Sequence, residues 1–302
     1  MKSVRCKLSL VASGLATVLL AGSVGAEVGV PVDTELSLRG GLYQILMLSD
    51  DPDPYLGFWV DVTASHTPSR IALNTDGDVN GDGPPSVLMN PFSGLPTVAW
   101  ARNSASGFDV VVSHFAAGAW SAPEVVADGT DDELDPHLVL DPVDGTVHLF
   151  YWVDTATPVV MYRHAPADLS SWSSPVQVSN GIDAAFRPGG VVHNGVLKVV
   201  YEVHAFGSGQ TPRDVILANW NGQSFVPQVL ALSNHDGELW PRLHSHSGRM
   251  WLEWIDADDQ MAWFRFENEA GWSPKQWESF ATVEEREFHV RGAIRIKATQ
   301  EP

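Results

Sequence analysis

Short apolar runs recur along the chain about every 50 residues, and each is followed by a turn of small residues and then a segment of alternating polarity. The second run of each unit ends in an aromatic residue, which we place at Trp100, Trp152, Tyr201 and Trp254. Alternation with a period of two is typical of strands, and no stretch beyond residue 26 shows a convincing helical period. The pattern therefore predicts an all-β chain built from repeated groups of four short strands.

A group of the form aromatic-x-Pro opens the fourth strand of each unit. The four groups end at Pro123, Pro175, Pro227 and Pro274. Proline has no N–H to donate to a β-ladder, so it is confined to edge strands and strand starts. A period of 40 to 50 residues with an outer edge strand in each unit is typical of a β-propeller blade. We therefore predict a single domain, a β-propeller of four-stranded antiparallel blades.

Five blades are the expected number. Their boundaries fall at about residues 36–79, 80–128, 129–179, 180–232 and 233–281. In the first and most degenerate unit we expect strands at 36–38, 42–48, 56–62 and 70–73. Residues 282–302 would then supply a strand that closes the ring. A six-bladed ring, in which the two ends of the chain build a further blade together, is the alternative.

Residues 136–152 and the group Trp172-Ser-Ser-Pro175 resemble the sialidase-like, BNR-type repeat propellers of secreted bacterial proteins. The resemblance extends over roughly residues 85–280 and implies a propeller fold. Such propellers include glycosidases, lyases, lectins and binding proteins, so the resemblance leaves the function open. The chain has no intact Ser-x-Asp-x-Gly-x-Thr-Trp box, and Ala185-Phe-Arg187-Pro188 matches the arginine motif of sialidases only in part.

The N-terminal segment has the pattern of a secretory signal peptide. Lys2, Arg5 and Lys7 precede an apolar run over residues 8–20, and small residues end the segment at Ala26. An uncleaved membrane anchor is the alternative, because residues 8–26 are almost long enough to span a bilayer. We expect residues 1–26 to be removed and the protein to be secreted or periplasmic, with no membrane span after cleavage.

The charge of the chain narrows the choice of partners. The formal net charge of −19 repels phosphate, so nucleic acid is not an expected partner. In antiparallel blades the loops between strands 2 and 3 and the connections between blades lie at one end, and most carboxylates fall in these segments. We expect this acidic face to carry the ligand site. It favours cations, neutral sugars or basic partners and disfavours anionic ligands unless calcium bridges them.

One local motif matches the first half of a calcium-binding loop. Asp76, Asp78, Asn80 and Asp82 alternate along a glycine-rich segment, with Gly81 at the sixth position. The usual acidic residue at position 12 is replaced by Val87. The alternative is a turn rich in Asp, Asn and Gly that needs no metal. Calcium is the cofactor that this motif suggests.

Carboxylates near the axis are the candidates for catalysis. A glycosidase needs two carboxyl groups roughly 5 to 10 Å apart. Acids at corresponding places, where the innermost strand of a blade begins, are Glu133, Asp135, Asp183 and Glu238. For each of them, an exposed loop acid or a satisfied polar residue is the alternative interpretation.

Four further residues are candidates for ligand binding. Arg187 and Arg242 occupy similar positions in neighbouring blades, and Trp240 in an acidic connection is suited to stacking on a sugar. Glu202 lies within a second strand, next to an aromatic residue. Pairing of the two arginines with nearby carboxylates is the alternative.

Three functions are compatible with these features. The first is a secreted propeller that binds an extracellular carbohydrate or cell-surface ligand on an acidic face, which calcium would order. The second is a glycoside hydrolase or polysaccharide lyase that uses the axial carboxylates. The third is a protein-interaction scaffold. The fold alone does not choose among them.

Overall fold

The structure is a computed structural model. It describes residues 29–36, 42–48, 57–62, 69–72, 82–89, 96–116, 119–204, 213–230, 238–246, 248–256, 261–268, 271–274 and 276–278. The expected signal peptide, the expected ring-closing segment 282–302 and three of the four calcium candidates, Asp76, Asp78 and Asn80, lie outside these residues.

The regular elements of the described residues are β-strands in five antiparallel sheets. The first sheet consists of β1 (Gly29–Leu36), β2 (Leu42–Leu48), β3 (Gly57–Val62) and β4 (Ser69–Ala72). The second consists of β5 (Ser86–Met89), β6 (Pro96–Ser104), β7 (Gly107–Ala116), β8 (Ala119–Trp120) and β9 (Glu124–Ala127). The third consists of β10 (Glu133–Leu140), β11 (Val147–Val153), β12 (Val159–Ala165) and β13 (Val176–Gln177).

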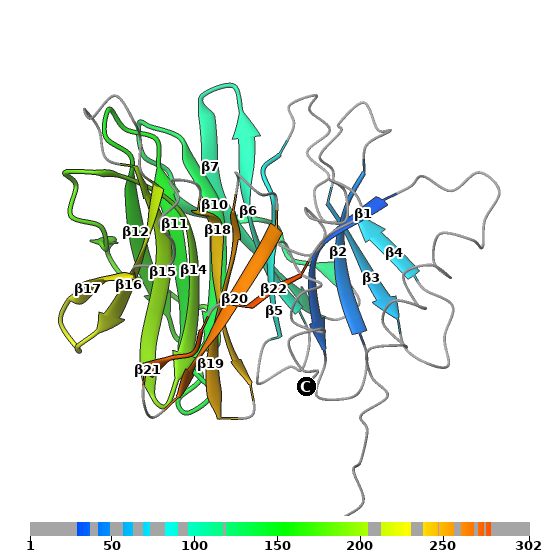
Figure 1. The fold of residues 1–302 in the computed structure, drawn as a ribbon. Coiled ribbons are helices and arrows are strands. Elements are labelled where there is room, and N and C mark those ends of the chain that lie inside the picture. Colours follow the sequence, from blue (N-terminus) through cyan, green and yellow to red (C-terminus); the bar gives the residue numbers. More distant parts are fainter. Residues whose placement is uncertain are drawn as a thin grey trace, which may run out of the picture.

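The last two sheets complete the arrangement. The fourth consists of β14 (Ala184–His193), β15 (Val196–His204), β16 (Arg213–Trp220) and β17 (Phe225–Leu230). The fifth consists of β18 (Glu238–His246), β19 (Arg249–Asp256), β20 (Met261–Asn268), β21 (Gly271–Trp272) and β22 (Gln276–Glu278). Each sheet is formed by strands that follow one another in the chain (Figure 1).

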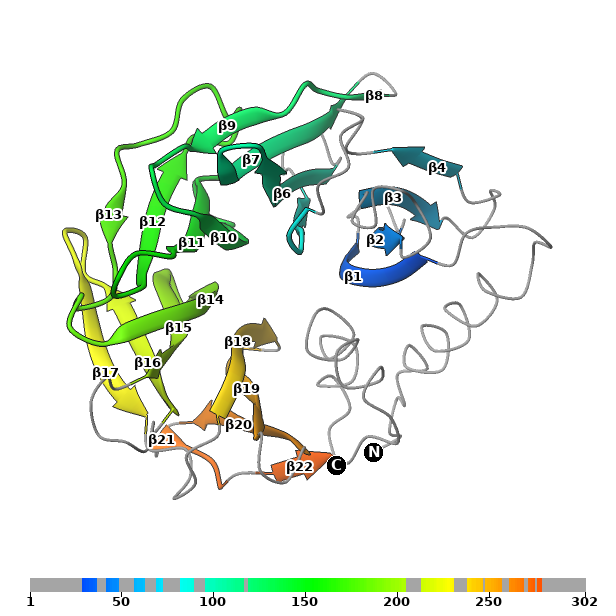
Figure 2. The ribbon, with the colours of Figure 1, turned by 90° about the horizontal axis from the view of Figure 1, so that it is seen from above.

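The sheets stand around a common centre, with the first strand of each sheet innermost and the last outermost (Figure 2). The innermost strands contact one another in chain order, from β1 through β5, β10 and β14 to β18. This arrangement confirms the predicted all-β propeller of four-stranded blades. The number of blades stays a prediction, because the segments expected to close the ring lie outside the described residues.

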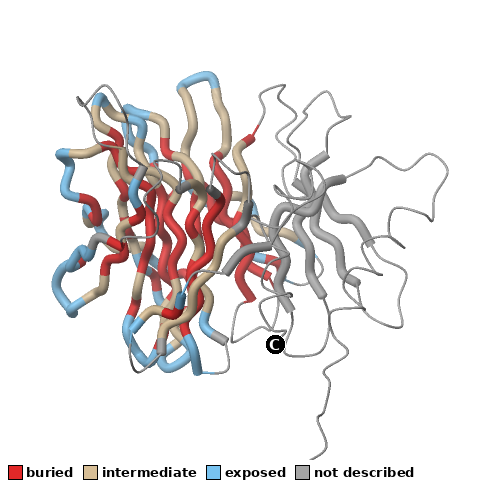
Figure 3. The backbone as a smooth tube through the Cα atoms, in the orientation of Figure 1, coloured by how far each residue is buried: buried red, intermediate tan, exposed pale blue. Residues whose placement is uncertain are grey.

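Alternation along the second strands explains how neighbouring sheets pack. In β11, Leu149 and Tyr151 pack with Val110 of the second sheet, whereas Phe150 packs with Tyr201 of the fourth. Successive side chains of a strand point to opposite faces, so a continuous apolar run covers both faces of its sheet. Figure 3 shows the result, with buried positions along the inner strands and exposed positions in the loops.

The register of the inner strands corrects one expected repeat position. One residue of each inner strand, namely Ser86, His137, Gly189 or Arg242, pairs with the second strand just before an aromatic residue. These aromatics are Trp100, Tyr151, Tyr201 and Trp254, and each is 2% exposed. The core aromatic of the third sheet is therefore Tyr151. We had expected Trp152, which lies one position later, on the opposite face of its strand.

The first sheet also begins earlier than expected. Its innermost strand is β1, which ends at Leu36, whereas the sequence pattern placed a strand over residues 36–38. The apolar pattern of β1 is interrupted by Pro31, Asp33 and Thr34, and its register shifts between Pro31 and Asp33. An interrupted alternation of this kind gives little signal to sequence analysis.

The edge prolines lie where the repeat predicts them. Pro123 and Pro175 immediately precede the outer strands β9 and β13, and Pro227 lies within the outer strand β17. Proline is tolerated at these places because the outer strand has a ladder partner on only one side.

In the part of the chain that the structure describes, no helix is long and apolar enough to cross a membrane.

Candidate functional site

Three successive inner strands are interrupted at the same repeat position. In β10, β14 and β18 the ladder slips near the start of the strand, and the residue inside each bulge has a positive φ, 46° at Asp135, 51° at Arg187 and 50° at Trp240. A non-glycine residue in this region costs of the order of 1–3 kcal/mol. Bulges re-aim a side chain and are frequent beside active sites.

A proline follows each bulge residue. Pro136, Pro188 and Pro241 have no N–H, so the proline of each bulge leaves no donor of its own without a partner. Each bulge therefore combines a residue in a left-handed conformation with one that cannot donate to the sheet. It recurs at spacings of 52 and 53 residues.

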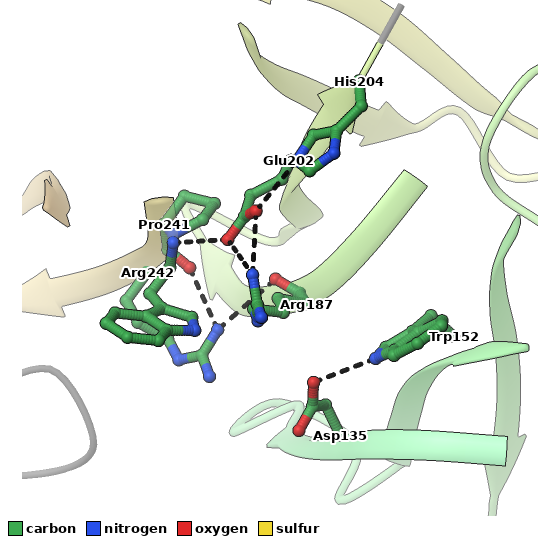
Figure 4. Close-up of polar contacts among 8 residues, drawn as sticks. Asp135, Trp152, Arg187, Glu202, His204, Pro241 and Arg242 are labelled. Carbon is green, nitrogen blue, oxygen red and sulfur yellow. Dashed lines mark hydrogen bonds and ion pairs between the residues drawn. The ribbon is translucent and has the colours of Figure 1, made fainter. Parts of the chain in front are cut away.

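The second strand of the sheet holds the bulge residue in two of the three cases (Figure 4). Trp152 Nε1 donates to Asp135 Oδ2 at 2.9 Å. Arg187 Nη1 donates to both carboxylate oxygens of Glu202, at 3.3 Å and 3.1 Å. Trp152 and Glu202 occupy equivalent positions, because each pairs across the ladder with the residue just before the bulge.

Glu202 also connects the fourth sheet to the fifth. Its Oε1 accepts a hydrogen bond from the backbone N–H of Trp240 at 2.5 Å, and His204 Nε2 lies 3.5 Å from its Oε2. The Glu202 side chain has no exposed surface, whereas 34% of the Arg187 side chain is exposed. A buried carboxylate is costly unless it is paired and hydrogen-bonded. Both oxygens of Glu202 meet that requirement.

The Arg187 guanidinium also lies over the indole of Trp240, with its central carbon 5.3 Å from the ring centroid. A guanidinium within about 6 Å of an indole face is attracted by the ring quadrupole. Arg242 closes the group, because its Nη1 donates to the carbonyl oxygens of Pro188 at 3.2 Å and Pro241 at 3.0 Å. The structure thus brings together the four residues predicted for ligand binding, Arg187, Glu202, Trp240 and Arg242.

Asp135 belongs to the same row of bulges. The indole of Trp152, which holds its carboxylate, packs edge-on against Phe186, the residue before Arg187, at a centroid distance of 5.1 Å. Asp135 and Arg187 are therefore linked through two aromatic side chains. Both bulge residues are half-buried, so part of each residue remains exposed.

The other catalytic candidates lie apart from this group. Asp183 is in the connection before β14, where its Oδ2 accepts a hydrogen bond from Asn180 Nδ2 at 3.2 Å and its backbone N–H donates to the same asparagine. That geometry is a capped turn. The side chain of Glu238 lies outside the described residues.

Glu133 is buried at a different boundary, between the second and third sheets. It is 4% exposed, and its Oε1 accepts a hydrogen bond from Gly129 N at 2.8 Å. Within the described residues its Oε2 has no hydrogen-bond partner. Burial, together with the neighbouring carboxylates of Asp109, Asp128 and Asp131, raises the pKa of Glu133 to about 7, against the opposing effect of the hydrogen bond from Gly129 N.

Asp82 is the one calcium candidate that the structure describes. It is 4% exposed, and its Oδ1 accepts a hydrogen bond from Asn103 N at 2.9 Å, which attaches the segment before β5 to β6. Among the described side chains, no three His, Cys, Asp or Glu residues are grouped so that they could hold a metal ion. Calcium binding by the segment from Asp76 to Asp82 stays a prediction.

The strand order places many acidic residues at the same end as the bulges. Those in the described loops and connections of that end are Asp82, Asp128, Asp131, Asp132, Asp154 and Asp183. The described turns of the opposite end contain Asp141, Asp144 and Asp168. The candidate site therefore lies at the start of the inner strands, on the face that the sequence predicts to be acidic.

Sequence reasoning missed the row of bulges and two residues that serve it. Trp152 was placed only as the aromatic that ends its second strand, and His204 was not singled out. The signal was present in the repeated groups Leu134-Asp-Pro, Phe186-Arg-Pro and Leu239-Trp-Pro. Each group consists of an apolar residue, a variable residue and a proline, and it marks the bulge of its inner strand. The variable residue, which the bulge presents, differs from sheet to sheet.

No protein-family model and no curated protein sequence matches the chain. Among solved structures, it is similar to the GH93 α-L-arabinofuranosidase of Fusarium graminearum in complex with arabinobiose, with 13% identity, a TM-score of 0.59, and coverage of 82% of this chain and 80% of that one. It is also similar to an endo-1,4-β-xylanase from Bacteroides thetaiotaomicron, with 12% identity, a TM-score of 0.52, and coverage of 84% and 97%.

A thermostable family-43 glycoside hydrolase is a third similar structure, with 11% identity, a TM-score of 0.52, and coverage of 84% of this chain and 94% of that one. At such low identities the similarity shows a shared fold. It extends over most of each chain, and it supports the assignment of the five described sheets to a propeller.

Proposed function

We propose that the protein binds a carbohydrate at the end of the propeller where the three bulged inner strands present Asp135, Arg187 and Trp240. The observation that carries this proposal is the repetition of the bulge. Arg187 and Trp240 hold a conformation that costs stability by about 1–3 kcal/mol each, and Asp135 holds the same conformation at lower cost, because aspartate tolerates the left-handed region better. Function is a common reason for retaining such strain, and the three side chains suit one kind of ligand.

The chemistry of the three residues matches a sugar. An indole offers an apolar face for the C–H groups of a pyranose or furanose ring, and it has a polar edge that tolerates water. Guanidinium N–H groups donate to hydroxyl oxygens, and a carboxylate accepts from hydroxyl groups. Trp240, Arg187 and Asp135 supply one of each. The N-terminal signal-like pattern supports a secreted or periplasmic protein.

The similar structures support the choice of first ligands. Their names identify an arabinofuranosidase bound to arabinobiose and a xylanase. Arabino- and xylo-oligosaccharides are therefore the first probes, and the same panel would include gluco-, galacto- and manno-oligosaccharides.

Isothermal titration calorimetry against this panel tests the proposal. We expect at least one neutral oligosaccharide to bind, and Trp240→Ala and Arg187→Lys to weaken that binding by about tenfold or more, since each removes an oriented contact. Arg249→Lys is the matched control, because Arg249 also lies over an aromatic ring, 5.2 Å from the centroid of Phe266, but at the opposite end of the propeller. If Trp240→Ala and Arg187→Lys bound the sugar as tightly as the control Arg249→Lys, the proposal would be overturned.

Hydrolysis of the bound sugar is the second candidate, because the similar structures in the comparison are named as glycoside hydrolases. A glycosidase requires a pair of carboxyl groups. Asp135 is the carboxylate in the row of bulges, so Asp135→Asn would abolish the release of reducing sugar and leave binding in place. If wild-type protein binds an oligosaccharide and releases no reducing sugar from it, this second candidate fails and the binding function stands.

A further inference from the structure

The charge of Arg187 is balanced inside the protein. Its Nη1 contacts both oxygens of Glu202, which is fully buried, and no counter-charge from a ligand is needed to satisfy it. About a third of the Arg187 side chain is exposed, so the guanidinium can still donate hydrogen bonds outward. In this state Arg187 acts toward a ligand as an oriented donor rather than as a free cation.

The same end of the propeller carries several carboxylates. Asp135 shares the row of bulges with Arg187, and the neighbouring connections carry Asp131, Asp132 and Asp183. A ligand carboxylate that approached Arg187 would compete with Glu202 for the guanidinium, and the carboxylates at this end of the propeller would repel it.

From these contacts we propose that Glu202 determines the charge class of the ligand: by neutralising Arg187 from within, it makes the site select neutral sugars and reject sugar acids. The inference rests on the carbohydrate-binding function proposed above. Glu202 acts through Arg187 and through the backbone N–H of Trp240, both of which it holds, and it has no exposed surface with which to touch the sugar itself.

A matched pair of ligands tests the inference. The probes are xylotriose and xylotriose that carries a single glucuronic acid branch, with further neutral and uronate-bearing pairs from the same panel if xylotriose does not bind. The measured quantity is the ratio of the two dissociation constants for each protein, because loss of folded protein affects both ligands equally and cancels. For the wild-type protein we expect the neutral sugar to bind at least tenfold more tightly.

Glu202→Gln is the decisive variant. Glutamine keeps the shape and the acceptor for the Trp240 N–H but removes the charge, so Arg187 becomes available to a ligand carboxylate. We expect the ratio to shift toward the uronate by about tenfold or more. Glu253→Gln is the matched control, because Glu253 is also buried, at 4% exposure, and accepts a hydrogen bond from His244 at 2.8 Å in the neighbouring sheet. Its ratio should equal that of the wild-type protein.

A second variant keeps the test decisive if Glu202→Gln does not fold. Arg187→Gln leaves the Glu202 charge without its partner, so the uronate should be disfavoured even more strongly than in the wild-type protein. If the wild-type protein binds neither class of sugar, the proposed function has failed. If it binds neutral sugar but the ratio is unchanged in the folded variant, the function stands and the role of Glu202 is refuted.

Discussion

Two glutamates are buried at the same end of the propeller but in opposite electrostatic settings. Glu202, at the boundary between the fourth and fifth sheets, accepts hydrogen bonds from Arg187 and from the backbone of Trp240. Glu133, at the boundary between the second and third sheets, has one oxygen on Gly129 N and one without a hydrogen-bond partner among the described residues. Around Glu133 the neighbouring charges are other carboxylates.

The contrast shows that burial of a carboxyl group does not by itself indicate a role in binding. The partners decide what the group does. A carboxylate whose oxygens are occupied fixes the groups that occupy them, as Glu202 fixes Arg187 and Trp240. A carboxylate that lacks partners favours its neutral form, and it then makes the stability of the fold depend on pH.

Removing the Glu202 side chain should produce the largest effect on stability. Glu202→Ala leaves Arg187 without its counter-ion and the Trp240 N–H without its acceptor, so we expect a loss of about 3 kcal/mol in the free energy of unfolding. Urea denaturation followed by circular dichroism measures it. Asp183→Ala, which removes a partly exposed turn acid, should cost under about 1 kcal/mol. An equal loss in the two variants would contradict the assignment of Glu202 as an organising residue.

The sequence predicted the members of the Glu202 group but not their contacts. The sequence places Arg187 and Arg242 at similar positions in neighbouring blades and Trp240 in an acidic connection, whereas the register aligns Arg187 with Trp240. Their positive φ values are not encoded by the residue types, since neither arginine nor tryptophan favours the left-handed region. The hydrogen bond from Trp240 to Glu202 joins residues 38 apart on different sheets, so it depends on how the sheets pack.

The fold was more accessible to prediction than the site, because a propeller repeats its signals. Edge prolines and core aromatics return at nearly constant spacing, so several weak indications support one architecture. Comparing repeats does not fix single positions. Trp152 was grouped with Trp100, although Tyr151 is the core aromatic of the third sheet. That shift of one residue changes the face of the strand, and it concealed the contact between Trp152 and Asp135.

Replacing Glu133 by glutamine should stabilise the protein at high pH. The folded-state pKa of Glu133 is about 7, against 4.5 for the ordinary side chain. Between these values the folded protein holds a proton that the unfolded chain has lost, so the contribution of Glu133 to stability is fully present below pH 4.5 and is lost as the pH rises through 7. Solvent at the rim screens part of the effect, and we expect 1–2 kcal/mol as an approximate magnitude.

Urea denaturation at pH 4.5 and pH 8 gives the measurement. Glu133→Gln should unfold at a higher urea concentration than the wild-type protein at pH 8, and the difference should shrink at pH 4.5, where both side chains are neutral. Glu202→Gln should not show this gain in stability at pH 8, because the Glu202 carboxylate that it replaces is paired with Arg187. A gain for Glu133→Gln that is the same at both pH values would mean that ionisation of the buried Glu133 carboxyl group is not its cause.

The smallest effect is expected at Asp135, where the row of bulges begins. Asp135→Asn should change the free energy of unfolding by less than about 0.5 kcal/mol, because asparagine tolerates the left-handed region and its side-chain oxygen can still accept from Trp152 Nε1. The chain already uses asparagine in this conformation at Asn194, where φ is 52°. Asp135→Val should cost roughly 1–2 kcal/mol more in the same urea titration, since a β-branched side chain is strained at a φ of 46°. If valine and asparagine were equally tolerated, the bulge would store no strain at Asp135, and the repeated strain from which we infer a binding site would have to rest on Arg187 and Trp240 alone.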